Sequence, residues 1–221
     1  MTRRPQFIIA AVLALTVAGS ARVDLIQGPV SVSTTMGEFS ASFPVENLIN
    51  QSALSGTYTS GVDDFATTVA TISHGQNVGE WASPVGTTTG NLDFDLGADL
   101  YVTQLVLWDS RLGAGEGDRS INDFTVLTDT NQSFTSSTNV GTFTNPRDVL
   151  DGTVFDLTDS SARFVRIQIQ SNYGANLTQM GEVAFASGVA AVPEPSACAF
   201  LGLIGVAIAC CRRRRDRALR T

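Results

Sequence analysis

Few residues of this chain have the types and spacing that catalysis requires. His74 is the single histidine, all three cysteines follow residue 197, and no Gly-x-Ser-x-Gly element is present. The carboxylate pairs Asp63 and Asp64, or Asp93 and Asp95, could in principle act as a general acid and base. Adjacent side chains of an extended chain point to opposite sides, however, and nothing distinguishes these acids from ordinary loop or strand-face carboxylates. The sequence therefore indicates a protein that is not an enzyme.

The clearest motif is a three-part tail near the C-terminus: a Pro-Glu-Pro element, a short apolar run and a cluster of arginines. Its residues are Pro193, Glu194 and Pro195, the run 197–211, and Arg212, Arg213, Arg214 and Arg215. The run is shorter than the roughly 20 residues of a comfortable membrane span. The prolines keep the strip before it extended, and clustered arginines stay on the cytoplasmic side. We therefore expect the body of the protein to lie outside the cytoplasmic membrane.

This tail resembles the PEP-CTERM sorting signal of Gram-negative bacteria over residues 193–217, because the three parts stand in that family's order and spacing. The resemblance implies recognition by an exosortase, a membrane-embedded cysteine protease or transpeptidase that removes the tail. The protein would be anchored transiently in the inner membrane and then reach the cell surface or the extracellular matrix. The alternative is an ordinary single-pass C-terminal anchor, which needs no Pro-Glu-Pro and usually has a longer apolar span.

Residues 1–21 have the features of a secretory signal peptide. Arg3 and Arg4 precede an apolar stretch from Phe7 to Ala18, and small residues follow it. Between the two processed ends there is room for one domain, which we expect over residues 22–187, followed by a short spacer at 188–192. The predicted location is thus the cell envelope or the extracellular matrix.

The charge of the body is strongly acidic. Six arginines and 19 acidic residues between Arg22 and Val192 give a net charge of −13, and the chain contains no lysine. Phosphate backbones repel such a surface, so nucleic-acid binding is disfavoured. The carboxylates are either solvated loop charges or, for a few of them, ligands of Ca²⁺.

The body shows β-strand patterns almost throughout. Arg163–Gln170 alternates apolar and polar residues with period two, and Leu100–Trp108 is nearly continuously apolar, as expected of a central strand. A helical turn is predicted only at Val45–Asn50, whereas 51–83 and 110–120 are predicted to be long loops. Strands without intervening helical patterns indicate an all-β, antiparallel sandwich or jelly roll. The other expected strands are Asn91–Leu96, Ile121–Leu127, Val140–Phe143, Thr153–Leu157 and Glu182–Phe185.

Seven short segments, taken in order, resemble the discoidin (factor 5/8 C-terminal) family, whose fold is called galactose-binding-like and which includes bacterial carbohydrate-binding modules. They are Asn47–Asn50, Glu80–Trp81, Leu92–Gly97, Val102–Leu107, Ile121–Val126, Ala162–Ile167 and Gly181–Val183. The resemblance implies a β-sandwich that binds a polysaccharide or another glycan. The alternatives are a structural protein of the biofilm matrix that binds no glycan and, third, a polysaccharide-acting enzyme.

The same resemblance implies a structural Ca²⁺ between an early turn and a late glutamate. The matching positions are Asn50, where the family has aspartate, and Glu182; Gln51 replaces the family's glycine. Because Ca²⁺ takes six to eight oxygen ligands, backbone carbonyls and Asp63 or Asp64 would have to complete the site.

The residues that could form a ligand edge lie in the expected loops. Trp81 and Trp108 are predicted to pack in the core rather than to stack on a sugar. The candidates with hydrogen-bonding side chains are His74, Tyr58, Arg111, Arg119 and Tyr173.

Overall fold

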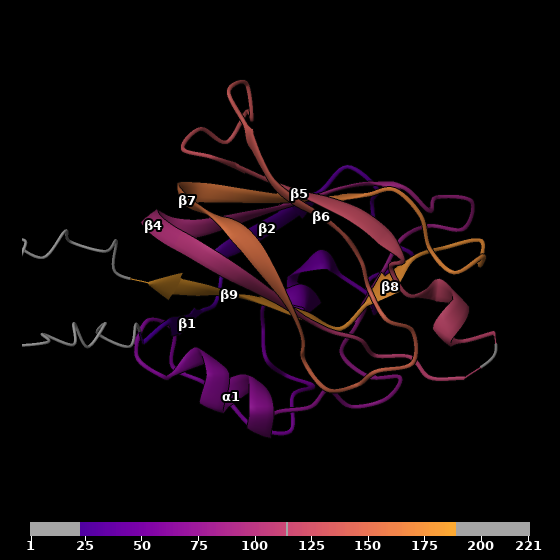
Figure 1. Cartoon of the computed structure of the whole chain (residues 1–221). Helices are drawn as coiled ribbons and strands as arrows, with labels where there is room; N and C mark the ends of the chain where they lie inside the picture. The colour runs from indigo at the N-terminus through magenta and orange to yellow at the C-terminus, as the bar shows by residue number, and fades with distance from the viewer. Residues whose placement is uncertain (1–22, 114, 189–221) are drawn as a thin grey trace, which may run out of the picture.

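Two long strands, β4 (Gly90–Trp108) and β7 (Thr153–Ile169), organise the fold (Figure 1). The computed structural model describes residues 23–113 and 115–188, so the predicted signal peptide and sorting signal lie outside the described residues. The remaining strands are β1 (Leu25–Gln27), β2 (Ser31–Thr34), β3 (Trp81–Ala82), β5 (Asp123–Asp129), β6 (Thr138–Thr144), β8 (Gln179–Met180) and β9 (Glu182–Gly188).

The long strands bend and thereby belong to both layers of an antiparallel sandwich. The first half of β4 pairs with β2 and the second half of β7, and the second half of β4 pairs with β9 and the first half of β7. A register shift between Asp95 and Leu100 separates the halves, and Gly97 there has φ +82°, which favours glycine. The strand order β1-β9-β4-β7-β5-β6 confirms the predicted antiparallel sandwich.

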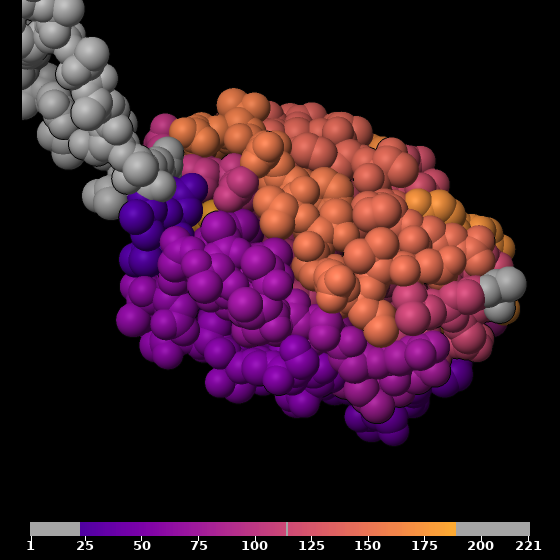
Figure 2. Space-filling view, turned by 60° about the horizontal axis from the view of Figure 1, so that its bottom comes forward, coloured from indigo at the N-terminus to yellow at the C-terminus, as the bar shows by residue number. Residues whose placement is uncertain are grey.

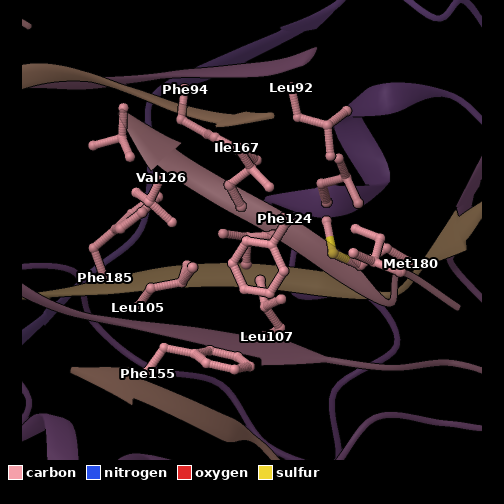
Figure 3. Packing of buried hydrophobic residues seen from close by; sticks show 14 of the residues in the cluster. Leu92, Phe94, Leu105, Leu107, Phe124, Val126, Phe155, Ile167, Met180 and Phe185 are labelled. Atoms are coloured by element: carbon pink, nitrogen blue, oxygen red, sulfur yellow. The ribbon is translucent and has the colours of Figure 1, made fainter. Parts of the chain in front are cut away.

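The main core fills the space between the layers. Figure 3 shows Leu92 and Phe94 on one side of Phe124, with Leu105 and Leu107 on the other. These side chains are almost fully buried, as period-two alternation in the strands requires. Trp81 belongs to this core, and its indole N–H donates to the carbonyl of Gly37 at 3.1 Å.

A second apolar cluster lies between the β1-β9-β4 layer and a helix, α1 (Phe65–Thr71), that was expected to be loop. The carboxylate of Asp64 caps this helix by accepting from the N–H of Thr67 at 2.7 Å. Phe65 and Val69, four residues apart on one helix face, pack toward the sheet. The prediction of a loop throughout 51–83 is therefore wrong.

The small residues Ala184 and Ala186 of β9 let α1 approach this second cluster closely. Trp108 is fully buried there and donates to the carbonyl of Ile72 at 2.9 Å. Both tryptophans are thus core residues, as predicted.

The other expected elements are mostly confirmed, with differences in extent. Residues 91–96 and 100–108 form one continuous strand instead of two, as do 153–157 and 163–169. The turn at Val45–Asn50 is the 3-10 helix η1 (Val45–Leu48), and the 110–120 loop contains a second one, η2 (Gly117–Arg119). Within residues 23–113 and 115–188, no helix has the length and apolar character that a membrane span needs.

Candidate functional site

The loops at one end of the sandwich are tied to one another and form what we call the loop end, comprising 37–44, 75–89, 109–113, 115–122, 145–151 and 171–181. Backbone hydrogen bonds join Asn77 to Ser110 at 2.9 Å and Ala175 to Asp118 at 3.2 Å. Figure 1 shows β8 and the neighbouring loops at this end, with β1 and the end of β9 on the opposite side. Strands β1 and β9 pair there, Leu25 lying opposite Ser187, so both described termini point away from the loop end.

Arg111 is the centre of a buried ionic network in the loop end. Its guanidinium donates to Asn77 Oδ1 at 2.6 Å and to Glu116 Oε2 at 2.7 Å, and it also pairs with Glu80. Arg111 is only 8% exposed and Glu80 only 2%. Arg111, predicted as a ligand contact, therefore mainly holds two loop segments together, one containing Asn77 and Glu80 and the other containing Arg111 itself and Glu116.

Arg119 and Tyr173 lie closer to the surface of the loop end. Arg119 shares Glu116 with Arg111 at 2.9 Å and donates to Gln179 at 3.3 Å. The ring of Tyr173 packs near the guanidinium of Arg147, 6.0 Å from the ring centroid. Both side chains keep part of their surface exposed, as a ligand contact requires.

Arg147 also connects the acidic side chains of the loop end. It pairs with Asp118 at 2.7 Å and with Asp148 at 3.3 Å. Arg147 was not among the predicted site residues, although the scarcity of arginine in so acidic a body is a signal in the sequence that points to it.

His74 and Tyr58 are not part of this surface. His74 is 3% exposed, its Nδ1 lies 2.7 Å from the carbonyl of Gly75, and burial lowers the pKa of the imidazole. Tyr58 packs in the α1 cluster, where burial and the nearby Glu182 raise the pKa of its hydroxyl. The structure thus brings together Arg111, Arg119 and Tyr173 and separates the other two candidates from them.

Glu182 contacts Gln51, the residue that follows Asn50. Glu182 is fully buried, and its Oε2 accepts from the N–H of Gln51 at 3.1 Å. Its Oε1 has no hydrogen-bond partner, and burial raises the pKa of the carboxyl to about 8. One buried carboxylate oxygen is therefore available to a cation or a proton.

The surrounding side chains do not complete a calcium shell. Asn50 Oδ1 accepts from the N–H of Ser52 at 2.8 Å, and the side-chain amide of Gln51 is bound to the backbone of Tyr58. Asp63 and Asp64 are engaged locally by the N–H groups of Thr59 and Thr67. Among residues 23–113 and 115–188, no group of three or more His, Cys, Asp or Glu side chains is placed to hold a metal. The side chains around Glu182 therefore supply few of the six to eight oxygens that Ca²⁺ takes, and backbone carbonyls would have to supply most of the rest.

A groove of about 520 Å³ runs along α1, where the helix meets the start of β7. Val69, Gly152 and Val154 line it together with Gln104 and Asp151. Figure 2 shows this face, on which the purple segment around α1 adjoins the orange start of β7. None of the five predicted ligand residues lines the groove, and the groove was not predicted because helix α1 was not predicted.

No protein-family model and no curated protein matches the sequence. Among solved structures, this chain is similar to truncated AlyQ with CBM32 and alginate lyase domains. The similarity covers 77% of this chain and 35% of the AlyQ chain, with 19% sequence identity and a TM-score of 0.52. The CBM32-1 and CBM32-2 domains of ZmpB from Clostridium perfringens, in complex with GalNAc, match 72% of this chain and 34% of their own, with 10% identity and a TM-score of 0.51. The chain has the galactose-binding-like fold.

The family 32 carbohydrate-binding module of NanJ from C. perfringens, in complex with galactose, is a third similar structure. It matches 75% of this chain and 99% of its own, with 11% identity and a TM-score of 0.49. The AlyQ and ZmpB structures both contain CBM32 domains, and the AlyQ structure also contains an alginate lyase domain.

Proposed function

We propose that the described domain is a carbohydrate-binding module that contacts a polysaccharide through the loop end. The observation that carries this proposal is the gathering of partly exposed planar groups, Arg119, Arg147 and Tyr173, on cross-linked loops at one end of the fold. Planar guanidinium and carboxylate groups make directional hydrogen bonds to sugar hydroxyls, and an aromatic ring suits the apolar face of a pyranose. The fold shared with carbohydrate-binding modules supports this proposal.

We also propose that the chain is exported and sorted. Residues 1–21 act as a signal peptide, and an exosortase recognises Pro193, Glu194 and Pro195 while the tail lies in the inner membrane. The described C-terminal strand ends at Gly188, beside Tyr101 and away from the loop end. An attachment through the C-terminus would therefore leave the loop end facing outward, toward exopolysaccharide.

The binding proposal is tested with the protein purified after export. Its retention is measured on a panel of immobilised polysaccharides that includes the exopolymer of the producing cell. We expect saturable binding that Arg119→Ala weakens by about fivefold or more, since contact arginines often contribute over 1 kcal/mol. The matched control is Arg163→Ala, which removes an arginine paired with Asp95 far from the loop end. Absence of binding across the panel would favour a structural matrix protein, and turnover of a polysaccharide would favour an enzyme.

The sorting proposal has a separate test. The mass of the protein isolated from cells should show loss of the C-terminal tail, and replacement of Pro193 and Pro195 by alanine should prevent that loss. An intact C-terminus at Thr221 in both forms would refute exosortase processing.

A further inference from the structure

The loop end carries more negative than positive charge. Its linked ionic groups are five carboxylates and three guanidinium groups, a net charge of −2 when all are ionised: Glu80, Asp109, Glu116, Asp118 and Asp148 with Arg111, Arg119 and Arg147. A ligand that approaches this surface therefore meets a negative potential, in addition to that of the acidic body.

Every arginine of the described residues has a carboxylate partner that competes with an anionic ligand. The chain has no lysine. Each of the five arginines within residues 23–113 and 115–188 already pairs with at least one carboxylate, the two outside the loop end being Arg163 with Asp95 and Arg166 with Asp93. A uronate would compete with these carboxylates for the guanidinium groups, and breaking the buried Arg111–Glu80 pair would leave a buried charge uncompensated.

Hydrogen-bond acceptors, in contrast, remain available. Glu116, Asp118 and Asp148 already pair with arginines, but their side chains are 42%, 32% and 40% exposed, and a carboxylate with about four acceptor positions can accept further hydrogen bonds from a ligand. Behind them, Glu80 Oε2 and Asp109 Oδ2 are buried without a hydrogen-bond partner. The loop end is thus a surface that accepts hydrogen bonds and attracts positive charge.

We infer that the loop end selects a polysaccharide whose repeating unit carries amino groups, and that it rejects polyuronates. This inference rests on the proposed glycan-binding function. The ammonium groups of such a polymer pair with the exposed carboxylates of Glu116, Asp118 and Asp148, while its hydroxyls bind the planar side chains beside them. Because the polymer repeats, several weak pairs act together.

The test compares three polymers with the protein purified after export: a deacetylated amino-glucan, the same glucan fully N-acetylated, and a polyuronate. We expect binding to the amino form, about tenfold weaker binding to the acetylated form, and none to the polyuronate. Raising the salt from about 0.05 to about 0.5 M should weaken binding to the amino form, because screening acts on exposed charges. Polyuronate binding, or equal binding of the acetylated form, would overturn the inference. Binding to no polymer of the wider panel would instead overturn the proposed function.

Matched variants distinguish binding at the loop end from general electrostatic attraction of the polymer to an acidic protein. Asp148→Asn and Asp99→Asn remove the same charge, but Asp99 lies at the opposite end, next to residues that pair with Ala162 and Gly188. Asparagine tolerates the φ of +64° at residue 148. We expect Asp148→Asn to weaken binding about twofold to fivefold and Asp99→Asn to leave it unchanged. Asp118→Asn is the second loop-end variant, used if the first lowers the melting temperature. Equal losses at both ends would show general attraction only and would overturn the inference.

Discussion

At the scale of single residues, burial distinguishes an arginine that stabilises the fold from one that can contact a ligand. Arg111 and Arg119 have similar sequence surroundings, yet one is buried between Glu80 and Glu116 while the other is partly exposed. The sequence predicted that both lie in one loop, but burial depends on segments as distant as residue 80. Local patterns therefore identified the loop and not the role of each arginine.

Removing Arg111 should destabilise the fold. The variant Arg111→Met leaves Glu80 buried without its partner, so we expect a loss of about 3–5 kcal/mol in the free energy of unfolding, measured with urea. The control Arg163→Met breaks an exposed pair with Asp95 and should cost less than about 1 kcal/mol. Similar costs for the two variants would contradict the structural role of Arg111.

Glu182 should make stability depend on pH. Burial raises the pKa of its carboxyl from 4.5 to about 8, so folding favours the protonated form. Its stabilising contribution is fully present below the unfolded pKa and is lost as the pH rises through about 8. Comparing Glu182→Gln with the natural chain isolates this group, and we expect their relative stability to change by on the order of 5 kcal/mol between the unfolded and folded pKa values.

The same comparison tests the calcium prediction. A ligand that binds only the folded state raises the melting temperature. Because the side chains near Glu182 do not complete a calcium shell, we expect millimolar Ca²⁺ to leave the melting temperature unchanged. A rise in the natural chain that is absent in Glu182→Gln would show a calcium site there.

At the scale of elements, alternating apolar residues predicted the long strands well. Short elements, and a helix of unusual composition, were predicted poorly. The period-two pattern of 163–170 was sufficient to locate most of the second half of β7. Helix α1 was missed because its sequence, Phe-Ala-Thr-Thr-Val-Ala-Thr, is rich in β-branched residues with low helix propensity. Its cap at Asp64 and its packing against β9 outweigh that propensity.

The packing of α1 on β9 gives a prediction at this scale. Ala184 is fully buried against the helix cluster, so Ala184→Leu should overpack the contact and cost about 1–3 kcal/mol in urea unfolding. Val154→Leu enlarges a side chain that is 40% exposed and should change stability by no more than about 0.5 kcal/mol. A small effect at residue 184 would mean that α1 does not pack as described.

At the scale of the whole molecule, the two ends of the sandwich have different roles in this account. The fold class was predictable because strands recur without helical patterns between them. Which loops form the loop end was not predictable, because the order of the loops along the chain does not indicate at which end of the sandwich each loop lies. Tyr58 and Arg119 are both in predicted loops, yet Tyr58 packs in the α1 cluster whereas Arg119 lies in the loop end.

The most direct measurement is amide hydrogen exchange of the exported protein with and without the exopolysaccharide of the producing cell. Binding slows exchange where the ligand orders or covers the backbone. We expect protection within 109–122 and 171–181 and none along the α1 groove, residues 65–73 and 151–154. Protection confined to the α1 groove would contradict the loop end as the glycan site.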